Sequence, residues 1–209
     1  MPNKLTLSKM AVACALITSA HAASANTVEI TPYIDYVITD ELELSETGQT
    51  LDVDDVAAIG FAIAWPESQL GQGQISVSYG NYDYEATNNQ SGDLVEGDFD
   101  VIYAHFSGVA HYRQPNYTTT VSVGIGGTYF SADRGDNSIY PSITGAIGTR
   151  YDLSQALSIV TELRAYGTFA DDNSKVFCES GPEGANCFGQ FDGSFWVDAA
   201  VRFGLAYRF

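Results

Sequence analysis

The hydrophobic pattern of this chain is most regular in its last sixteen residues, 194–209. Every second side chain from Phe195 to Phe209 is apolar or aromatic, and the positions between them are mostly small or charged. A period of two residues predicts a β-strand with one apolar and one polar face. A soluble sandwich can contain such a strand, although soluble strands are usually ~5–6 residues long. A membrane-spanning barrel requires several strands of this kind.

The same alternation recurs along the rest of the chain and predicts seven further strands. In most of them, large apolar residues occupy one face, and Gly, Ala, Ser and Thr occupy the other. Pro32, in the first of these strands, has no N–H to donate and predicts a bulge or a local gap. The seven strands are expected at 27–39, 56–65, 74–84, 98–112, 117–130, 139–151 and 156–169.

The strand expected at 98–112 is ambiguous, because both of its faces carry apolar residues. We assign its odd-numbered positions to the outer face, since that choice agrees with the neighbouring strands. The outer face would then carry Phe99, Val101, Tyr103 and Val109.

The connections between the strands alternate between short and long. The short ones are 66–73, 113–116 and 152–155, and the long ones are 40–55, 85–97, 131–138 and 170–193. Outer-membrane barrels have short periplasmic turns, long outer loops, an even strand number and an apolar exterior. A soluble lipocalin-like barrel would be apolar inside and polar outside. We therefore predict an all-β fold, an eight-stranded antiparallel up-and-down transmembrane β-barrel with short periplasmic turns and long acidic outer loops.

The N-terminus is typical of a signal peptide. A positively charged start is followed by an apolar core too short to span a membrane, and then by small residues. Cleavage is expected after Ala25, with Ala22 or Ala23 as alternatives. The chain then divides into a signal peptide, 1–25, and an outer-membrane β-barrel, 26–209.

Two cysteines, Cys178 and Cys187, lie in the longest predicted loop. An even pair in an exported chain predicts one disulfide, and a free thiol pair is the alternative. The spacing lacks the nearby histidine that a zinc site would need. Cys14 lies inside the predicted signal peptide, and the residues before it match a lipidation site poorly.

The charge balance excludes some classes of partner. The chain has 26 acidic and 9 basic residues, a net charge of −17. Such a chain lacks the basic surface that nucleic acid or anionic lipid headgroups require. Most of the acids lie in the long connections, where they could hold a divalent cation, but no EF-hand spacing is present. We interpret them as a solvated acidic rim, and we expect no metal and no cofactor.

The alternating pattern also places charged side chains inside the predicted barrel. Charges in a lumen of low dielectric must be paired. Glu162 and Arg164 share a face of one strand, and Asp198 and Arg202 share a face of its neighbour, which allows cross-strand pairs. We interpret the charges as a structural plug, because the side chains usually fill a barrel of eight strands. The full predicted network is Glu29, Asp35, Arg150, Glu162, Arg164, Asp198 and Arg202.

The signal peptide, the alternating strands and the terminal Leu205, Tyr207 and Phe209 together resemble the small outer-membrane barrel superfamily of Gram-negative bacteria. This porin-family group includes the OmpA transmembrane domain and the OmpX and OmpW types. The resemblance implies an integral protein of the bacterial outer membrane, surrounded by lipid and lipopolysaccharide. It also implies that these three residues form the signal read by the barrel assembly machinery. No peptidoglycan-binding domain follows the barrel in this sequence.

His105 and Ser107 share one strand face, an arrangement similar to that of the outer-membrane lipid A deacylases. A nucleophile also needs an acid to orient its base, and no outward-facing acid is identifiable nearby. We therefore expect no enzyme. The predicted function is a non-enzymatic role in envelope integrity or surface interaction through the acidic loops, as a monomer, with an extracellular ligand that the sequence does not identify. The alternatives are a narrow channel, gated by exchange of lumen ion pairs as in OmpA-like barrels, or a lateral-passage transporter for small solutes. A lipid-modifying enzyme is a third alternative.

Overall fold

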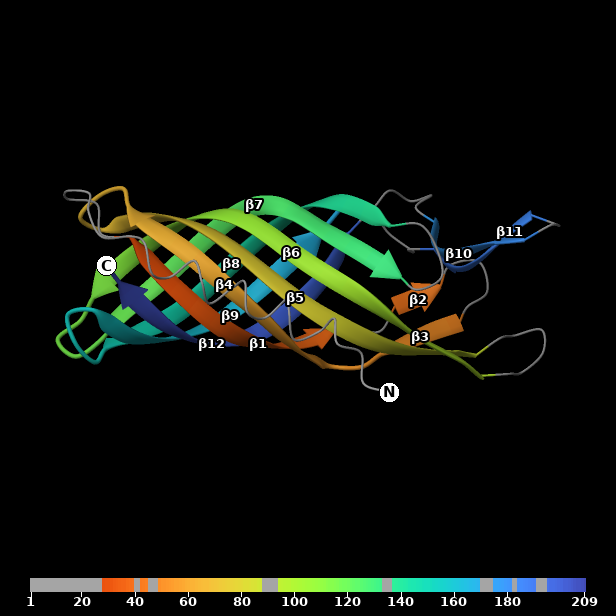
Figure 1. Ribbon diagram of the computed structural model, residues 1–209, viewed down its shortest axis with the longest axis horizontal. Helices are drawn as coiled ribbons and strands as arrows, with labels where there is room; N and C mark the ends of the chain where they lie inside the picture. Colours follow the sequence, from red (N-terminus) through yellow and green to blue (C-terminus); the bar gives the residue numbers. More distant parts are fainter. Residues whose placement is uncertain are drawn as a thin grey trace, which may run out of the picture.

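Eight antiparallel strands close into a barrel in the computed structural model (Figure 1). In order around the barrel they are β1 (Glu29–Thr39), β4 (Val56–Pro66), β5 (Gly71–Thr87), β6 (Leu94–Arg113), β7 (Thr118–Ala132), β8 (Ser138–Asp152), β9 (Leu157–Thr168) and β12 (Trp196–Arg208), which pairs with β1. The predicted fold class and strand number are therefore confirmed. No helix among the described residues is long and apolar enough to cross a membrane.

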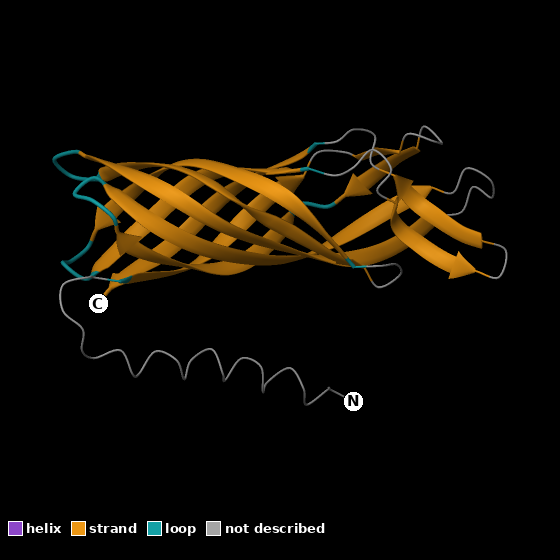
Figure 2. Cartoon of the chain, turned by 90° about the horizontal axis from the view of Figure 1, so that it is seen from above, coloured by secondary structure: helices purple, strands orange, loops and turns teal. Residues whose placement is uncertain are grey.

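Two short hairpins lie at one end of the barrel. The first consists of β2 (Leu42–Leu44) and β3 (Gln49–Val53), and β3 continues the sheet along the outer part of β5. The second consists of β10 (Lys175–Gly181) and β11 (Gly184–Gln190), which form a two-stranded sheet of their own. We call this end the loop end. The short connections and the C-terminus lie at the opposite end, the turn end (Figure 2).

The structure describes residues 28–39, 42–44, 49–87, 94–132, 137–169, 175–181, 184–190 and 195–209. For 42–44, 49–53, 84–87, 94–96, 132, 175–181 and 184–190 it describes the backbone only. The predicted signal peptide, 1–25, and parts of the predicted long loops lie outside this range.

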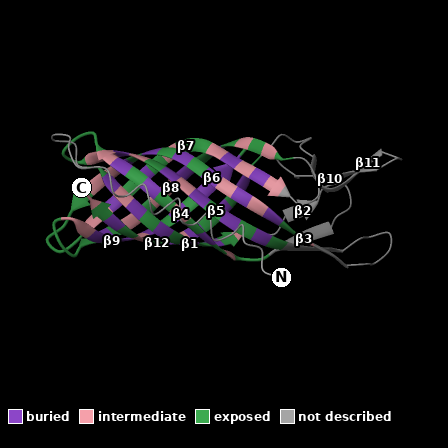
Figure 3. Ribbon diagram, in the orientation of Figure 1, coloured by how far each residue is buried: buried purple, intermediate pink, exposed green. Residues whose placement is uncertain are grey.

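The two faces of the barrel wall have opposite character. Buried and exposed residues alternate along the strands (Figure 3), as a period of two requires. The outer face is apolar, with Val123, Ile125 and Ile139 about 70% exposed or more. Serines, threonines and charged residues point into the lumen. A soluble barrel would show the reverse, so this exterior is one that faces lipid.

The predicted orientation of β6 is wrong. Its odd-numbered residues, including Phe99 and Tyr103, are buried in the lumen, and Phe106 is exposed on the outside. The cause is the register with β5, which places Phe106 directly opposite the outward-facing Ile75. Directly opposed residues of an antiparallel pair share a face. Because the odd-numbered residues of β5 face outward, the even-numbered residues of β6 must face outward too. The four residues assigned to the outside are thus Phe99, Val101, Tyr103 and Val109, all of them inside.

Pro32 produces a gap and not a bulge. On the β12 side the register pairs Ile30 with Tyr207 and Tyr33 with Gly204, and it skips the two residues between. The offset is the same on both sides of the gap, so no extra residue is inserted. On the other side Pro32 stays in register with Phe61 of β4. The missing N–H therefore interrupts one ladder only.

Candidate functional site: the barrel lumen

The lumen is the candidate functional site because it gathers nearly all buried charge of the described residues. All seven charged residues placed there by the sequence pattern are buried in it, each at most 8% exposed. Their side chains and the surrounding rings form three layers between the turn end and the loop end.

The layer nearest the turn end is centred on Arg150 of β8. Its guanidinium contacts both carboxylate oxygens of Glu29, at 2.7 Å from Nη1 and 2.6 Å from Nη2. Nη2 also donates to the Ser158 hydroxyl at 2.8 Å, and Nε contacts Asp152 at 3.1 Å. Arg208, at the rim, lies 3.4 Å from Glu29. Each of the three guanidinium nitrogens of Arg150 therefore contacts an oxygen atom. These contacts hold β8 to β1 across the lumen.

Asp152 is the last residue of β8, at the turn end and outside the membrane-spanning part of the wall. The Ser158 hydroxyl donates to its carboxylate at 2.6 Å. This hydrogen bond, together with the bond from Arg150, lowers the pKa of Asp152 below its ordinary value. The carboxylate thus remains ionised and retains its contact with Arg150.

The middle layer is centred on Arg202 of β12 and Asp35 of β1. Nε and Nη2 of Arg202 donate to the two carboxylate oxygens of Asp35 at 2.7 and 2.8 Å. The guanidinium lies over the ring of Tyr33, 3.3 Å from its centroid. Asp35 also accepts hydrogen bonds from Ser78 at 3.2 Å and from Tyr166 at 3.1 Å. This is a bidentate pair in which further hydrogen bonds satisfy the carboxylate, as a buried pair requires.

Two further charges belong to the middle layer. Arg164 donates to Glu162 at 2.8 Å and to Thr144 at 3.1 Å. Glu162 also lies 3.8 Å from Arg202, its register partner on β12. The cross-strand contact that the sequence suggested between these two strands is thus present at this one position. The closer partner of Arg202 is Asp35, which the spacing within one strand could not indicate.

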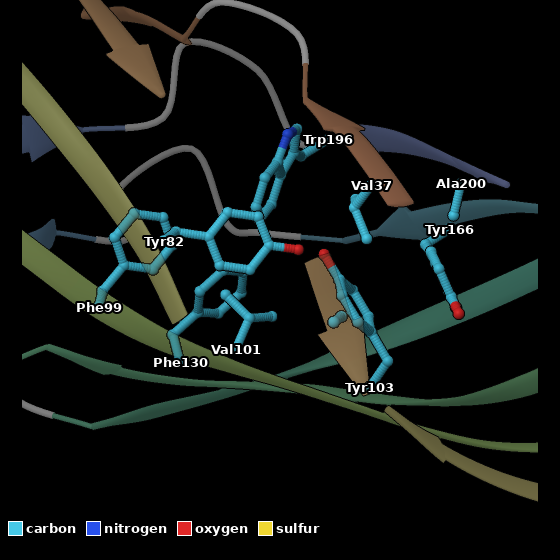
Figure 4. Close-up of a cluster of buried hydrophobic side chains, with 10 residues drawn as sticks. Val37, Tyr82, Phe99, Val101, Tyr103, Phe130, Tyr166, Trp196 and Ala200 are labelled. Carbon is cyan, nitrogen blue, oxygen red and sulfur yellow. The ribbon is translucent and has the colours of Figure 1, made fainter. Parts of the chain in front are cut away.

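The layer nearest the loop end is aromatic (Figure 4). Tyr82 and Phe99 stack with ring centroids 5.2 Å apart, and Phe130 lies 5.2 Å from Trp196. Tyr103 stacks on Tyr166 of the middle layer at 4.2 Å. Sequence reasoning missed this aromatic cluster because it placed Phe99 and Tyr103 on the outside. The parity of the β5–β6 register would have revealed it.

A small cavity lies among the charged residues of the described part of the lumen. It measures about 30 Å³ and lies in the half of the lumen nearer the turn end, beside Arg150, Glu162 and Arg202. It also borders Gln74 and Thr120. A buried water needs roughly 10–15 Å³ of such space, so the cavity has room for about two waters. It does not form a path for a solute.

His105 and Ser107 both face the lumen. His105 is 3% exposed, and its Nε2 lies 2.9 Å from the hydroxyl of Ser142. Ser107 is fully buried, and its hydroxyl has no hydrogen-bond partner among the described residues. Neither side chain reaches the lipid-facing surface, where an enzyme acting on lipid would need them. In the described part of the chain, no group of three or more His, Cys, Asp or Glu side chains is arranged to hold a metal.

The residues of the predicted assembly signal lie together on the outside of the barrel, at the end of β12 and directly after it. Leu205, Tyr207 and Phe209 are between 42% and 49% exposed, and the last two rings meet edge to face at 4.8 Å. The backbone N–H of Phe209 donates to the carbonyl of Val28 at 3.0 Å. This bond extends the pairing between the first and the last strand of the barrel. That the barrel assembly machinery recognises these three residues remains a prediction.

The cysteines lie in the β10–β11 hairpin, whose register places Cys178 directly opposite Cys187. Their side chains lie outside the described atoms, so the disulfide remains a prediction. An antiparallel pair of directly opposed residues has the Cα separation that a disulfide can bridge.

We expect alkylation of the unfolded, unreduced protein to modify no cysteine, and alkylation after reduction to modify both, as measured by intact mass. The bond would close a short loop and stabilise the hairpin by ~2–3 kcal/mol. Because this hairpin is a separate sheet, a C178S/C187S variant should retain the unfolding midpoint of the barrel. Free thiols in the unreduced protein would contradict the prediction.

Comparisons with known proteins show which solved structures share this fold. No protein-family model and no curated protein sequence matches the chain. Among solved structures, the outer membrane protein OprG from Pseudomonas aeruginosa matches with a TM-score of 0.60 and 10% identity, over 89% of this chain and 96% of that one. Neisserial surface protein A matches at 0.53 and 11% identity, over 90% and 100%. Outer membrane protein W of E. coli matches at 0.50 and 14% identity, over 90% and 100%.

At these identities the likeness is one of fold. The chain is an eight-stranded barrel of the type found in small outer-membrane proteins, as its sequence predicted. The predicted location in the bacterial outer membrane is confirmed by this fold together with the apolar exterior.

Proposed function

We propose that this protein is a non-conducting barrel that acts at the cell surface through its acidic outer segments, in envelope integrity or surface interaction. The observation that carries the proposal is the filled lumen. Two layers of ion pairs and one of aromatic rings cross it, and the cavity beside them measures about 30 Å³. Passage of a solute would require breaking at least one buried ion pair.

The distribution of charge supports the same proposal. The chain carries 26 acidic residues, most of them in the segments that connect strands at the loop end. At the same end Asp55, between β3 and β4, is exposed, and so are Asp83 of β5 and Asp98 of β6. A dense negative surface of this kind attracts cations and basic partners by long-range electrostatics. The proposal includes no enzymatic activity, and the burial of His105 and Ser107 away from lipid supports that part of it.

Two measurements test the proposal. In planar bilayers, we expect the purified barrel to show no discrete openings, and reproducible single-channel steps would favour the channel alternative. In cells that lack the protein, a variant in which 40–55, 85–97, 131–138 and 170–193 are replaced by short turns should fail to restore resistance to detergent and chelator, or attachment to surfaces. Heat-modifiable gel migration would show that this variant still folds. Full restoration by the shortened variant would refute a role for the loops.

A further inference from the structure

Asp198 differs from the other three acids of the lumen. Glu29, Asp35 and Glu162 each contact an arginine. Asp198 is 1% exposed and has no cationic partner among the described residues. Its carboxylate accepts a hydrogen bond from the Tyr103 hydroxyl, and its other oxygen, Oδ1, has no hydrogen-bond partner there. An ionised carboxylate in this position lacks a counter-charge, which is costly in a buried site.

Other buried oxygen atoms surround this carboxylate. Thr39 is the register partner of Asp198 on β1, so the two side chains are adjacent on the lumen face. The Thr39 hydroxyl is buried beside the Asp198 carboxylate, and the Tyr82 hydroxyl is buried beside that of Tyr103. Figure 4 shows the hydroxyls of Tyr82 and Tyr103 pointing toward each other. One carboxylate and three hydroxyls therefore meet at the base of the aromatic cluster.

The chemistry of this oxygen cluster selects a class of ligand. Carboxylate and hydroxyl oxygens are hard donors that suit alkali and alkaline-earth cations, whereas transition metals prefer nitrogen and sulfur. A single carboxylate balances one positive charge, and divalent cations are usually held by more than one. We propose that Asp198, Tyr103, Tyr82 and Thr39 form a binding site for a monovalent alkali cation inside the loop-end half of the lumen.

The surroundings agree with a cation that enters from the loop end and stops at this site. Acidic side chains at that end raise the local concentration of cations. Arg202 and Arg164 lie deeper in the lumen and repel a cation that would pass further. The bound ion would act as the counter-ion of the Asp198 carboxylate and would not be transported.

Thallous ion tests this proposal, because it is a monovalent cation that quenches tryptophan fluorescence by contact. The chain has two tryptophans, and Trp196 lies two positions from Asp198 on the same face of β12. In a W65F variant, Trp196 is the only tryptophan, and excitation on the red edge of its absorption avoids tyrosine emission. We expect thallous nitrate to quench it with a saturable phase, and potassium or sodium nitrate to reverse that phase. D198N should weaken the saturable phase at least tenfold, and T39V should weaken it several-fold. E67Q removes an exposed acid at the turn end and should leave the phase unchanged.

A second readout guards against quenching at other acids. The thermal unfolding midpoint of the wild type should rise in potassium or sodium nitrate relative to choline nitrate of equal ionic strength, and that of D198N should not. Quenching that is linear in thallous ion would overturn the proposal, because it indicates collision only. A saturable phase that survives in D198N would also overturn it, since the cation would then bind elsewhere. An equal ion dependence of both midpoints would have the same meaning.

Discussion

Replacement of Arg202 by methionine is expected to lower the free energy of unfolding of the barrel by about 3–5 kcal/mol. Arg202 is 2% exposed and bonds both oxygens of Asp35, which is fully buried. Without the guanidinium, Asp35 keeps the hydroxyls of Ser78 and Tyr166 but loses its only cationic partner among the described residues. Methionine fills much of the same volume, so the cost arises from the uncompensated charge and not from a void.

The measurement is reversible denaturant unfolding of the barrel in lipid vesicles, followed by gel migration and tryptophan fluorescence. R113M provides a matched control, because Arg113 is an exposed arginine at the end of β6. It should change stability by no more than about 0.5 kcal/mol. The double variant D35N/R202M should recover most of the loss, since no unpaired charge remains. A loss below about 1 kcal/mol in R202M would show that water or a rearranged side chain already compensates Asp35.

The architecture could be predicted because each strand carries its own signal. Alternation places Val123 and Ile125 outside and Ser122 inside β7, whatever the neighbouring strands do. The lumen location of Asp35 and Arg202 follows from the same parity. These inferences need only the geometry of a single strand and the hydrophobic effect at its apolar face.

The partners of the lumen charges could not be predicted in the same way. Asp35 and Arg202 lie at opposite ends of the chain, 167 residues apart, and become register partners only when β1 closes the barrel against β12. The prediction of the orientation of β6 failed for a related reason. Whether its odd- or even-numbered residues face outward depends on the number of residues in the preceding connection. A strand with apolar side chains on both faces carries no local signal that corrects such an error.

The small residues on the inner face of β4 are the other feature with a large expected effect. Tyr33 and Gly60 are register partners, and the tyrosine ring lies over the glycine. A Cβ atom added at Gly60 would lie 2.4 Å from the ring and 2.4 Å from the carbonyl oxygen of Val77. Tyr33 cannot move freely, because its hydroxyl donates to Val77 at 2.9 Å and its ring supports the guanidinium of Arg202. The lumen layer of Arg202 therefore depends on a glycine of β4, two strands away from β12 in the same part of the wall.

We expect G60A to destabilise the barrel by about 1–3 kcal/mol, the usual cost of forcing extra atoms into a packed interior. G108A is the matched control, because a Cβ at Gly108 would meet nothing within 4 Å on the outer face of β6. That change should leave stability unaltered or raise it by up to about 1 kcal/mol, since alanine reduces the entropy of the unfolded chain. Both variants are measured by the unfolding assay used for R202M. Equal stability of G60A and G108A would mean that the wall between β1, β4 and β5 can yield, and that Tyr33 is not held against Gly60.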